Sequence, residues 1–206
     1  MKVHTIFTTR HDGDMRKKKF PDTVCCEQVH GNRIAVVRAR DAGKTIPGVD
    51  GLVSTDSVRL AVRTADCVPV LAWDERRGVV GAAHAGTRGT RLRIAQNLIS
   101  KMTKLGAKVQ DIRVILGPHV GPCCYTVPED RAKKFSASVI RYDGTRWFID
   151  IGKENRQQCI EMGIIPKNIT LSSECTACNT HKYFSFRKDS KKSYGEQMGV
   201  IWIGKN

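Results

Sequence analysis

The chain has 206 residues, of which 40% are hydrophobic and 27% charged, and its formal net charge is +15. This composition excludes a disordered or fibrous chain, and the length favours one folded domain over residues 1–206. No apolar stretch approaches the roughly 20 residues of a membrane span, and the N-terminus has no run of signal-peptide length. We therefore expect a cytoplasmic protein without a membrane partner.

Strands are predicted where apolar side chains alternate or β-branched residues cluster. In chain order they span residues 3–9, 33–38, 67–73, 79–83, 112–116, 147–151, 169–172 and 199–203. Helices are predicted at residues 90–105, 128–139 and 153–162, where apolar residues recur at helical spacing or helix-capping residues stand at the ends. Strands and helices do not alternate regularly, so we expect an α+β fold, a single-domain sandwich around a mixed β-sheet with flanking helices.

The excess of 35 Lys and Arg over 20 Asp and Glu favours anionic partners. The basic residues are spread along the chain, apart from small clusters at residues 16–19 and 187–192, and only 6% of residues are aromatic. Nucleic-acid-binding modules usually concentrate their charge on one face or intersperse stacking aromatics. A basic nucleic-acid-binding module is therefore disfavoured, although it stays an alternative interpretation.

Eight cysteines include the adjacent pairs Cys25-Cys26 and Cys123-Cys124. Adjacent cysteines rarely form a disulfide with each other, because its geometry strains the intervening peptide. We expect reduced thiols, in keeping with a cytosolic redox environment.

Three segments place a metal-competent side chain beside a glycine or at a strand end. They are Q-V-H-G with His30, T-A-D-C with Cys67, and A-A-H-A-G with His84. Their separations match no local zinc-finger pattern, and a histidine near a strand end is more often structural. A further motif, C-x-x-C-x-x-H at Cys175, Cys178 and His181, could begin a second metal site, but no fourth ligand stands out.

Seven ordered motifs resemble the laccase-domain family, also named multicopper polyphenol oxidases, whose members are zinc-dependent purine nucleoside phosphorylases and adenosine deaminases. The motifs are T-T-R at 8–10, Q-V-H-G at 28–31, D-G-L-V at 50–53, T-A-D-C-V-P-V-L at 64–71, A-A-H-A-G-T-R-G at 82–89, G-P-H-V-G-P-C-C-Y at 117–125, and C-T followed by Y-F-S-F-R at 183–187. The resemblance implies phosphorolysis of adenosine, inosine or methylthioadenosine to the free base and ribose 1-phosphate. It also implies adenosine deamination as a second activity.

The resemblance further implies that His30, Cys67 and His84 hold Zn²⁺, with copper possible in vitro. Two imidazoles and one thiolate suit zinc, and three protein ligands leave a fourth position for water or substrate. An oxidase is a poor interpretation, because the ligand set lacks a weak axial Met and six histidines are too few for several linked copper sites.

The same resemblance suggests roles for residues around the metal. For catalysis the candidates are Asp66, Arg88 and Cys124; for substrate or phosphate binding they are Arg10, Gln28 and Arg187. Asp66 would move a proton during deamination; capping a turn and orienting a ligand imidazole are equally compatible with its position. Arginine side chains suit the phosphate of phosphorolysis. Arg91 and Arg93, by contrast, are expected on the exposed face of the helix.

An enzyme of another class is possible from the same cysteines. Cys123 or Cys124 would serve a cysteine hydrolase or amidase as nucleophile, with His119 or His84 as its base. Packing thiols are the more common role of such cysteines.

The chain departs from the family pattern at three places. Thr87 stands where relatives carry tryptophan, which removes a large ring from the expected substrate pocket. The segment between T-T-R and Q-V-H-G is short, with D-G-D-M-R-K-K-K at 12–19 where relatives have a longer loop, and Glu196 follows Gly195 where a basic residue is usual. These changes put the preferred substrate and the level of activity in question, but they leave the metal ligands in place.

Overall fold

The computed structural model describes residues 1–189 and 194–204, so residues 190–192 of the second basic cluster lie outside the described part. The strands are β1 (Lys2–Phe7), β2 (Thr23–Cys26), β3 (Ile34–Val36), β4 (Thr45–Ile46), β5 (Gly51–Ser54), β6 (Arg59–Thr64), β7 (Val68–Asp74), β8 (Val79–Ala85), β9 (Arg113–Leu116), β10 (Thr126–Val127), β11 (Ile140–Tyr142), β12 (Trp147–Ile149), β13 (Ile169–Leu171) and β14 (Gln197–Gly204). The α-helices are α1 (Thr87–Arg91), α2 (Ile94–Lys104), α3 (Glu129–Ala132) and α4 (Ile151–Glu161).

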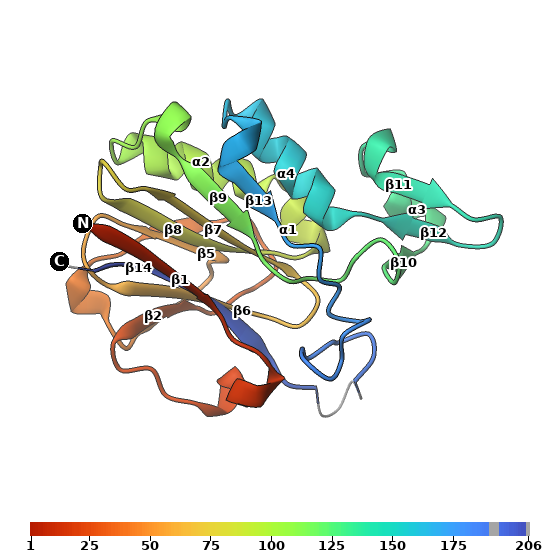
Figure 1. Cartoon of the computed structure of the whole chain (residues 1–206), viewed down its shortest axis with the longest axis horizontal. Helices are drawn as coiled ribbons and strands as arrows, with labels where there is room; N and C mark the ends of the chain where they lie inside the picture. The colour runs from red at the N-terminus through yellow and green to blue at the C-terminus, as the bar shows by residue number, and fades with distance from the viewer. Residues whose placement is uncertain (190–193, 205–206) are drawn as a thin grey trace.

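Two mixed sheets form most of the fold (Figure 1). The five-stranded sheet has the order β1-β14-β6-β2-β4, and the six-stranded sheet has the order β13-β9-β7-β8-β5-β3. The inner pairs of the six-stranded sheet are antiparallel, whereas its edge strands β13 and β3 pair in parallel. The expected α+β fold is thereby confirmed, with two mixed sheets packed against each other.

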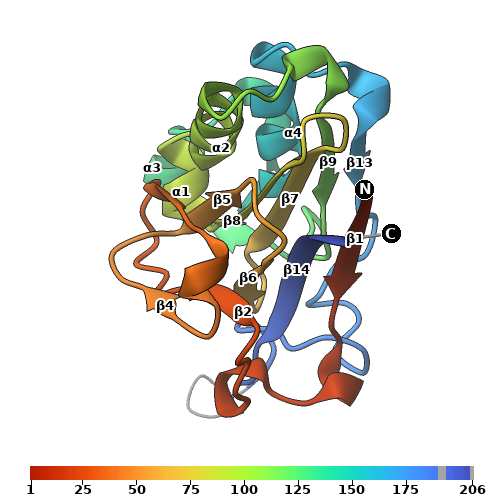
Figure 2. The same cartoon turned by 90° about the vertical axis from the view of Figure 1, so that its left-hand side faces the viewer.

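The core has two layers, one between the sheets and one beneath the helices (Figure 2). Because successive side chains of a strand point to opposite faces, β7 contributes to both layers. Leu71 belongs to the core between the sheets, together with Leu60 and Ile201, while Val70 belongs to the core on the helical side, together with Leu98 of α2. The helices α2 and α4 therefore cover the outer face of the six-stranded sheet.

A third sheet, of order β10-β12-β11, lies beyond the ends of the two large sheets, at the right of Figure 1 together with α3. The two ends of the described chain meet at the opposite side, because β1 and β14 are antiparallel and pair Lys2 with Gly204. No helix among the described residues has the length and apolar character needed to cross a membrane.

All eight predicted strands are present, with bounds shifted by a few residues. The predicted helix at 90–105 is interrupted at Arg93, whose φ of 60° separates α1 from α2. The predicted helix at 128–139 is wrong beyond Ala132, where α3 ends, and only a 3-10 turn follows at Ala137–Val139. The predicted helix at 153–162 corresponds to α4.

Candidate metal centre and its pocket

The side chains of His30, Cys67 and His84 converge at one edge of the six-stranded sheet, where β7 begins and β8 ends. Each offers one ligand atom, and the three atoms lie within 4.8 Å of one another. The imidazole rings of His30 and His84 meet edge to face with their centroids 4.8 Å apart. The structure thus brings together the three residues that the motifs singled out.

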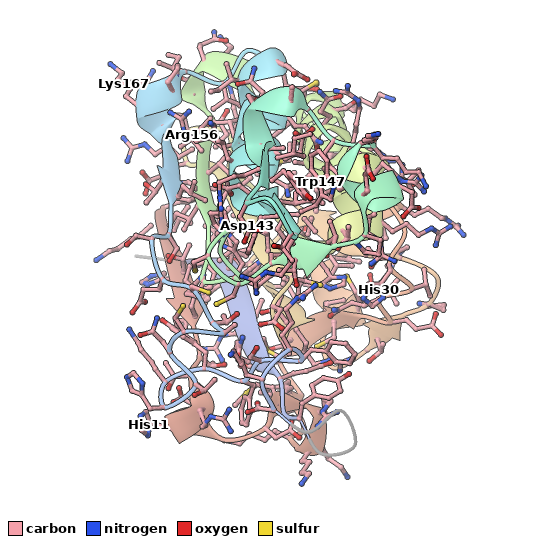
Figure 3. The ribbon with its side chains drawn as sticks, turned by 90° about the vertical axis from the view of Figure 1, so that its right-hand side faces the viewer. His11, His30, Asp143, Trp147, Arg156 and Lys167 are labelled. Atoms are coloured by element: carbon pink, nitrogen blue, oxygen red, sulfur yellow. The ribbon has the colours of Figure 1, made fainter. Side chains whose placement is uncertain are left out.

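Strand register explains why Cys67 meets His84. The strands β7 and β8 are antiparallel, with Pro69 opposite His84 and Val68 opposite Ala85. Cys67 precedes the first residue of β7, so its side chain lies beside the end of β8 that carries His84. His30 reaches the same edge from the loop that follows β2, on the face seen in Figure 3.

A fully buried carboxylate, that of Asp50, orients two of the three ligands. Its Oδ1 lies 3.0 Å from Nδ1 of His84 and accepts the backbone N–H of His30 at 2.9 Å. Its Oδ2 accepts the backbone N–H groups of Val29 and Gly31 at 3.2 and 2.7 Å. These bonds fix the His30 loop and leave Nε2 of His84 for the metal position, as the partner of a metal-ligating histidine does.

Asp50 lies within the D-G-L-V motif, but the sequence analysis assigned it no role and offered Asp66 as the possible anchor of a ligand imidazole. The structure gives that place to Asp50. The sequence signal that could have identified Asp50 was an acidic residue beside an apolar strand, within a motif that matches the family. A carboxylate at such a position is costly to bury without partners.

The charges at the triad favour the ligating form of the cysteine. Burial raises the pKa of the Cys67 thiol, but the charge of His84 and hydrogen bonds with both imidazoles outweigh it and lower the pKa below its usual value. Burial lowers the pKa of His84, and the attraction of Cys67 and Asp50 more than reverses this. The thiolate is the metal-binding form of cysteine, and here the charge of protonated His84 stabilises it, so a metal ion would have to displace that proton.

Backbone conformation is unusual at this edge. Gln28, His30 and Asp66 have positive φ angles of 67°, 58° and 85°. Such angles are uncommon outside glycine and cluster where a site holds its side chains in place. Gly86 completes the edge, because a Cβ built there would lie 3.1 Å from both Sγ of Cys67 and Cδ2 of His30.

The donor set fits zinc. Zn–N bonds of about 2.0–2.1 Å and Zn–S bonds of about 2.3 Å place tetrahedral ligand atoms roughly 3.3–3.8 Å apart. The ligand atoms of the triad lie within 4.8 Å of one another and include no carboxylate. Because residue 86 is glycine, no side chain of its own crowds the ligand atoms of Cys67 and His30.

A pocket of about 640 Å³ opens beside the triad, which is within the usual range for small-molecule sites. Its wall is strongly basic, with Arg63, Arg88, Arg91, Arg131, Lys134 and Arg187. Among the described residues, Arg88, Arg91 and Arg131 form no ion pair. The pocket therefore combines a metal-competent edge with cations that are available to an anion.

Aromatic rings form another part of the wall. The guanidinium of Arg187 lies over the ring of Tyr125, 4.4 Å from the ring centroid, and the hydroxyl of Tyr125 is hydrogen-bonded to that of Thr87. Phe186 and Tyr194 meet edge to face with their centroids 5.2 Å apart. Thr87, which replaces the usual tryptophan, thus contributes a polar contact to the pocket in place of a ring.

Asp66 and Gln28 line the pocket, but their polar atoms bind the protein itself. Oδ1 of Asp66 accepts the hydroxyl of Thr176 at 2.6 Å, and Oδ2 accepts the backbone N–H of Arg187 at 2.8 Å. The side chain of Gln28 makes two hydrogen bonds, of 2.7 and 2.8 Å, with the backbone of Arg63. Both residues hold segments of the wall in position.

The expected arginines are divided between the pocket and the surface. Arg88 and Arg187 line the pocket, and so does Arg91, which is exposed as expected. Arg10 lies outside the lining, where its guanidinium binds Asp189 at 2.7 Å. Arg93 is on the surface and pairs with Glu161 at 2.9 Å.

Cys124 also lies outside the pocket lining. Its Sγ is 3.4 Å from Sγ of Cys178, and hydrogen bonding to that thiol together with burial raises its pKa to about 11. Nδ1 of His119 is 2.8 Å from the carbonyl oxygen of Gly117. This is not the thiolate and imidazole arrangement of a cysteine hydrolase.

The C-x-x-C-x-x-H motif is arranged differently from the expectation. Cys175 and Cys178 cluster with Cys123 and Cys124, whose sulfur atoms complete a four-cysteine group. His181 is exposed and does not belong to this group. The missing ligands of the motif therefore come from a loop some fifty residues earlier in the chain.

The remaining departures from the family pattern meet at one side of the pocket. Glu196 forms an ion pair of 3.1 Å with Arg63, and its backbone N–H donates to Asp14 of the short N-terminal segment. The acidic residue thus neutralises one pocket arginine and leaves the others unchanged.

Comparison with known proteins identifies the family of the chain. The sequence model of the family described as "Multi-copper polyphenol oxidoreductase laccase" matches residues 8–204. "Purine nucleoside phosphorylase YlmD" of Geobacillus stearothermophilus is 36% identical over 183 residues, which cover 81% of this chain and 67% of that protein. The human "Purine nucleoside phosphorylase LACC1" is 37% identical over 75% of this chain, but the match spans only 38% of the human protein.

A relative with another named activity is also similar. "Adenosine deaminase RL5" from an unknown prokaryotic organism is 33% identical over 81% of this chain and 70% of its own length. Among solved structures, the crystal structure of YlmD from Geobacillus stearothermophilus superposes with a TM-score of 0.84 at 34% identity, covering 90% of this chain and 74% of that one.

Proposed function

Because the chain belongs to the multi-copper polyphenol oxidoreductase laccase family, we propose that it is a zinc-dependent purine nucleoside phosphorylase with adenosine deaminase as a second activity. One observation carries the proposal: His30, Cys67 and His84 converge beside a basic and partly aromatic pocket. Relatives named for each of the two activities support it.

The triad would hold one Zn²⁺ through two imidazole nitrogens and one sulfur. When bound, zinc supplies Lewis acidity to the pocket, which polarises a substrate atom or acidifies a water molecule. Asp50 keeps the proton of His84 on Nδ1, so that Nε2 is free to bind.

In phosphorolysis, phosphate attacks C1′ of the ribose. The C1′–N9 bond breaks, its electron pair and the proton of hydrogen phosphate go to the departing purine, and a C1′–O bond forms. Arg88 and Arg187 are suited to hold the phosphate, because guanidinium groups bind its oxygens in pairs. Their positive charge also reduces the repulsion between the phosphate and the leaving base, on which negative charge develops.

The purine has a matching wall. The exposed ring of Phe186 lines the pocket, so a planar base can stack on it, whereas the ring of Tyr125 is already covered by Arg187. The paired hydroxyls of Thr87 and Tyr125 offer hydrogen bonds where a tryptophan would offer only an apolar face and one donor. In deamination, water adds at C6 of the same bound purine and the amino group leaves as ammonia.

Asp66 acts in this proposal as a positioning residue. It holds the backbone of Arg187 and the hydroxyl of Thr176, so its charge fixes one phosphate-binding segment against the metal edge. Gln28 has the same role toward Arg63.

The test is product analysis on metal-quantified protein incubated with adenosine or inosine, with and without phosphate. We expect free base and ribose 1-phosphate only when phosphate is present, and inosine from adenosine in either case. Cys67→Ala should abolish both reactions, whereas Cys159→Ala, a cysteine buried in α4 away from the pocket, should retain them. Protein that carries its zinc and leaves every purine nucleoside unchanged would contradict the proposal.

A further inference from the structure

Four cysteines gather at a second place, apart from the pocket. Cys123 and Cys124 lie in the loop between β9 and β10, and Cys175 and Cys178 lie in the segment after β13. Their four sulfur atoms are all within 4.8 Å of one another. Sγ of Cys178 is 3.5 Å from that of Cys123 and 3.4 Å from that of Cys124.

These distances suit a shared metal ion better than a disulfide. A Zn–S bond of about 2.3 Å places the sulfurs of a tetrahedral four-cysteine site roughly 3.8 Å apart. Sulfurs joined in a disulfide are only about 2.05 Å apart, and a disulfide would use two of the four thiols. All four cysteines of the group are free.

The backbone around the group is arranged to receive charged sulfur. The N–H of Gly121 donates to Sγ of Cys175 at 3.2 Å. A Cβ at Gly121 would lie 3.3 Å from Cβ of Cys175 and 3.4 Å from Sγ of Cys123, so a larger residue would press on the group.

We propose that Cys123, Cys124, Cys175 and Cys178 bind a second Zn²⁺ with a structural role. Four protein thiolates close the coordination sphere, which is typical of structural zinc, whereas the triad of His30, Cys67 and His84 keeps an open position. This inference is independent of the proposed enzymatic function, since it concerns a different set of ligands.

The site would join two walls of the pocket. The 117–125 loop carries Val120 and Tyr125 into the lining, and the segment after Cys178 carries Phe186 and Arg187. A bridge between His119 and Cys175 already pairs the two segments at one point. Zinc at the four cysteines would fasten them at a second point, next to the residues that contact substrate.

The test counts zinc in full-length protein purified under reducing conditions and dialysed against metal-free buffer. We expect about two zinc ions per chain in the wild type, and about one in both the Cys123→Ser/Cys178→Ser double variant and His84→Ala. Cys159→Ala is the matched control and should keep both. The inference would be overturned if the wild type held one zinc ion that was retained in Cys123→Ser/Cys178→Ser and lost in His84→Ala. If that wild-type protein still turned over nucleosides, the proposed function would stand without the second site.

A second measurement covers the case in which the double variant does not fold. His84→Ala keeps all four cysteines of the group, so loading it with Co²⁺ should give the intense sulfur-to-metal absorption of a four-thiolate site. Absence of this absorption would overturn the proposal. So would a disulfide between the two segments, detected by mass spectrometry after the thiols are trapped in freshly lysed cells.

Discussion

The carboxylate of Asp50 accepts hydrogen bonds from the backbone of residues 29–31 and contacts Nδ1 of His84. The buried Asp50 side chain therefore sets the position of His30 and the ring orientation of His84. A neutral amide at this place would keep the size of the side chain, but it would weaken the preference of His84 for the tautomer that binds metal.

We predict that Asp50→Asn weakens zinc binding at the triad by about 10- to 100-fold, the usual effect of losing such a partner. Competition with a chelator of known affinity measures the change. Asp74→Asn is the matched control, because Asp74 is equally buried and accepts two backbone N–H groups away from the site. Equal affinities for the wild type and Asp50→Asn would show that the carboxylate has no part in orienting the metal ligands.

Gly86 offers a steric test of the same centre. Its φ of −74° is open to any residue, so alanine there introduces no backbone strain, and its effect comes from the Cβ that would approach Cys67 and His30. We predict that Gly86→Ala folds but loses most of its triad zinc and its nucleoside turnover. Circular dichroism checks the fold, and full zinc occupancy with unchanged turnover would refute the prediction.

The ligands could be anticipated from the sequence, but their supports could not. His30, Cys67 and His84 each lie in a short motif that matches the family pattern. The role of Asp50 depends on hydrogen bonds to residues about twenty and thirty-four positions away, which spacing along the chain does not reveal. For Asp66 the sequence left proton transfer, a turn cap and an anchor for a ligand imidazole open, and only the fold shows that both its oxygens are occupied by protein donors.

At the scale of elements, α1 has the most direct consequence for function. It begins directly after Gly86 and carries Arg88 and Arg91, which are three residues apart and therefore on one face of the helix. Both arginines line the pocket beside the metal edge. The helix thus couples the positions of these two arginines to that of His84 on β8.

We predict that Arg88→Ala raises the KM for phosphate by roughly tenfold to a hundredfold, since a hydrogen bond to a charged group contributes about 1.5–3 kcal/mol. Adenosine deamination without phosphate should be unaffected. Arg93→Ala, which removes a surface arginine paired with Glu161, is the control. Steady-state kinetics at varied phosphate tests this, and an unchanged KM in Arg88→Ala would remove the residue from the phosphate site.

The break between α1 and α2 gives a stability prediction. Arg93 has a left-handed backbone conformation, which costs a non-glycine residue about 1–2 kcal/mol, and its exposed ion pair contributes little. Arg93→Gly should therefore leave the protein as stable or more stable. Lys101→Gly, inside α2, should instead cost about 1 kcal/mol. Urea unfolding compares the two, and equal losses of stability would contradict this account of the break.

Hydrophobic periodicity predicted the helical character of residues 90–105 but not this break, because Arg93 is not a residue type that signals one. The strands that were not predicted are β2, β4, β5, β6, β10 and β11, and β5 and β6 were missed for another reason. β5 contains Gly51 and Ser54, and β6 begins at Arg59, so neither shows the alternation expected of a half-buried strand. Both are buried on two sides, where polarity along the strand is a weak guide.

At the scale of the whole molecule, the mixed sheets assemble the site from distant parts of the chain. The neighbouring ends of β7 and β8 supply two ligands, and the loop after β2 supplies the third. Residues between 120 and 135, together with residues 186, 187, 194 and 196, line the pocket. The fold class followed from the irregular order of the predicted elements. The pairing of β1 with β14 and the meeting of the four cysteines are long-range contacts, which local sequence patterns do not encode.

Anomalous X-ray diffraction at the zinc absorption edge, on crystals of protein shown to be active, tests the central claim most directly. The account predicts an anomalous peak about 2.0–2.3 Å from one nitrogen each of His30 and His84 and from Sγ of Cys67. Active crystals that contain zinc elsewhere, with no peak among these three side chains, would contradict it.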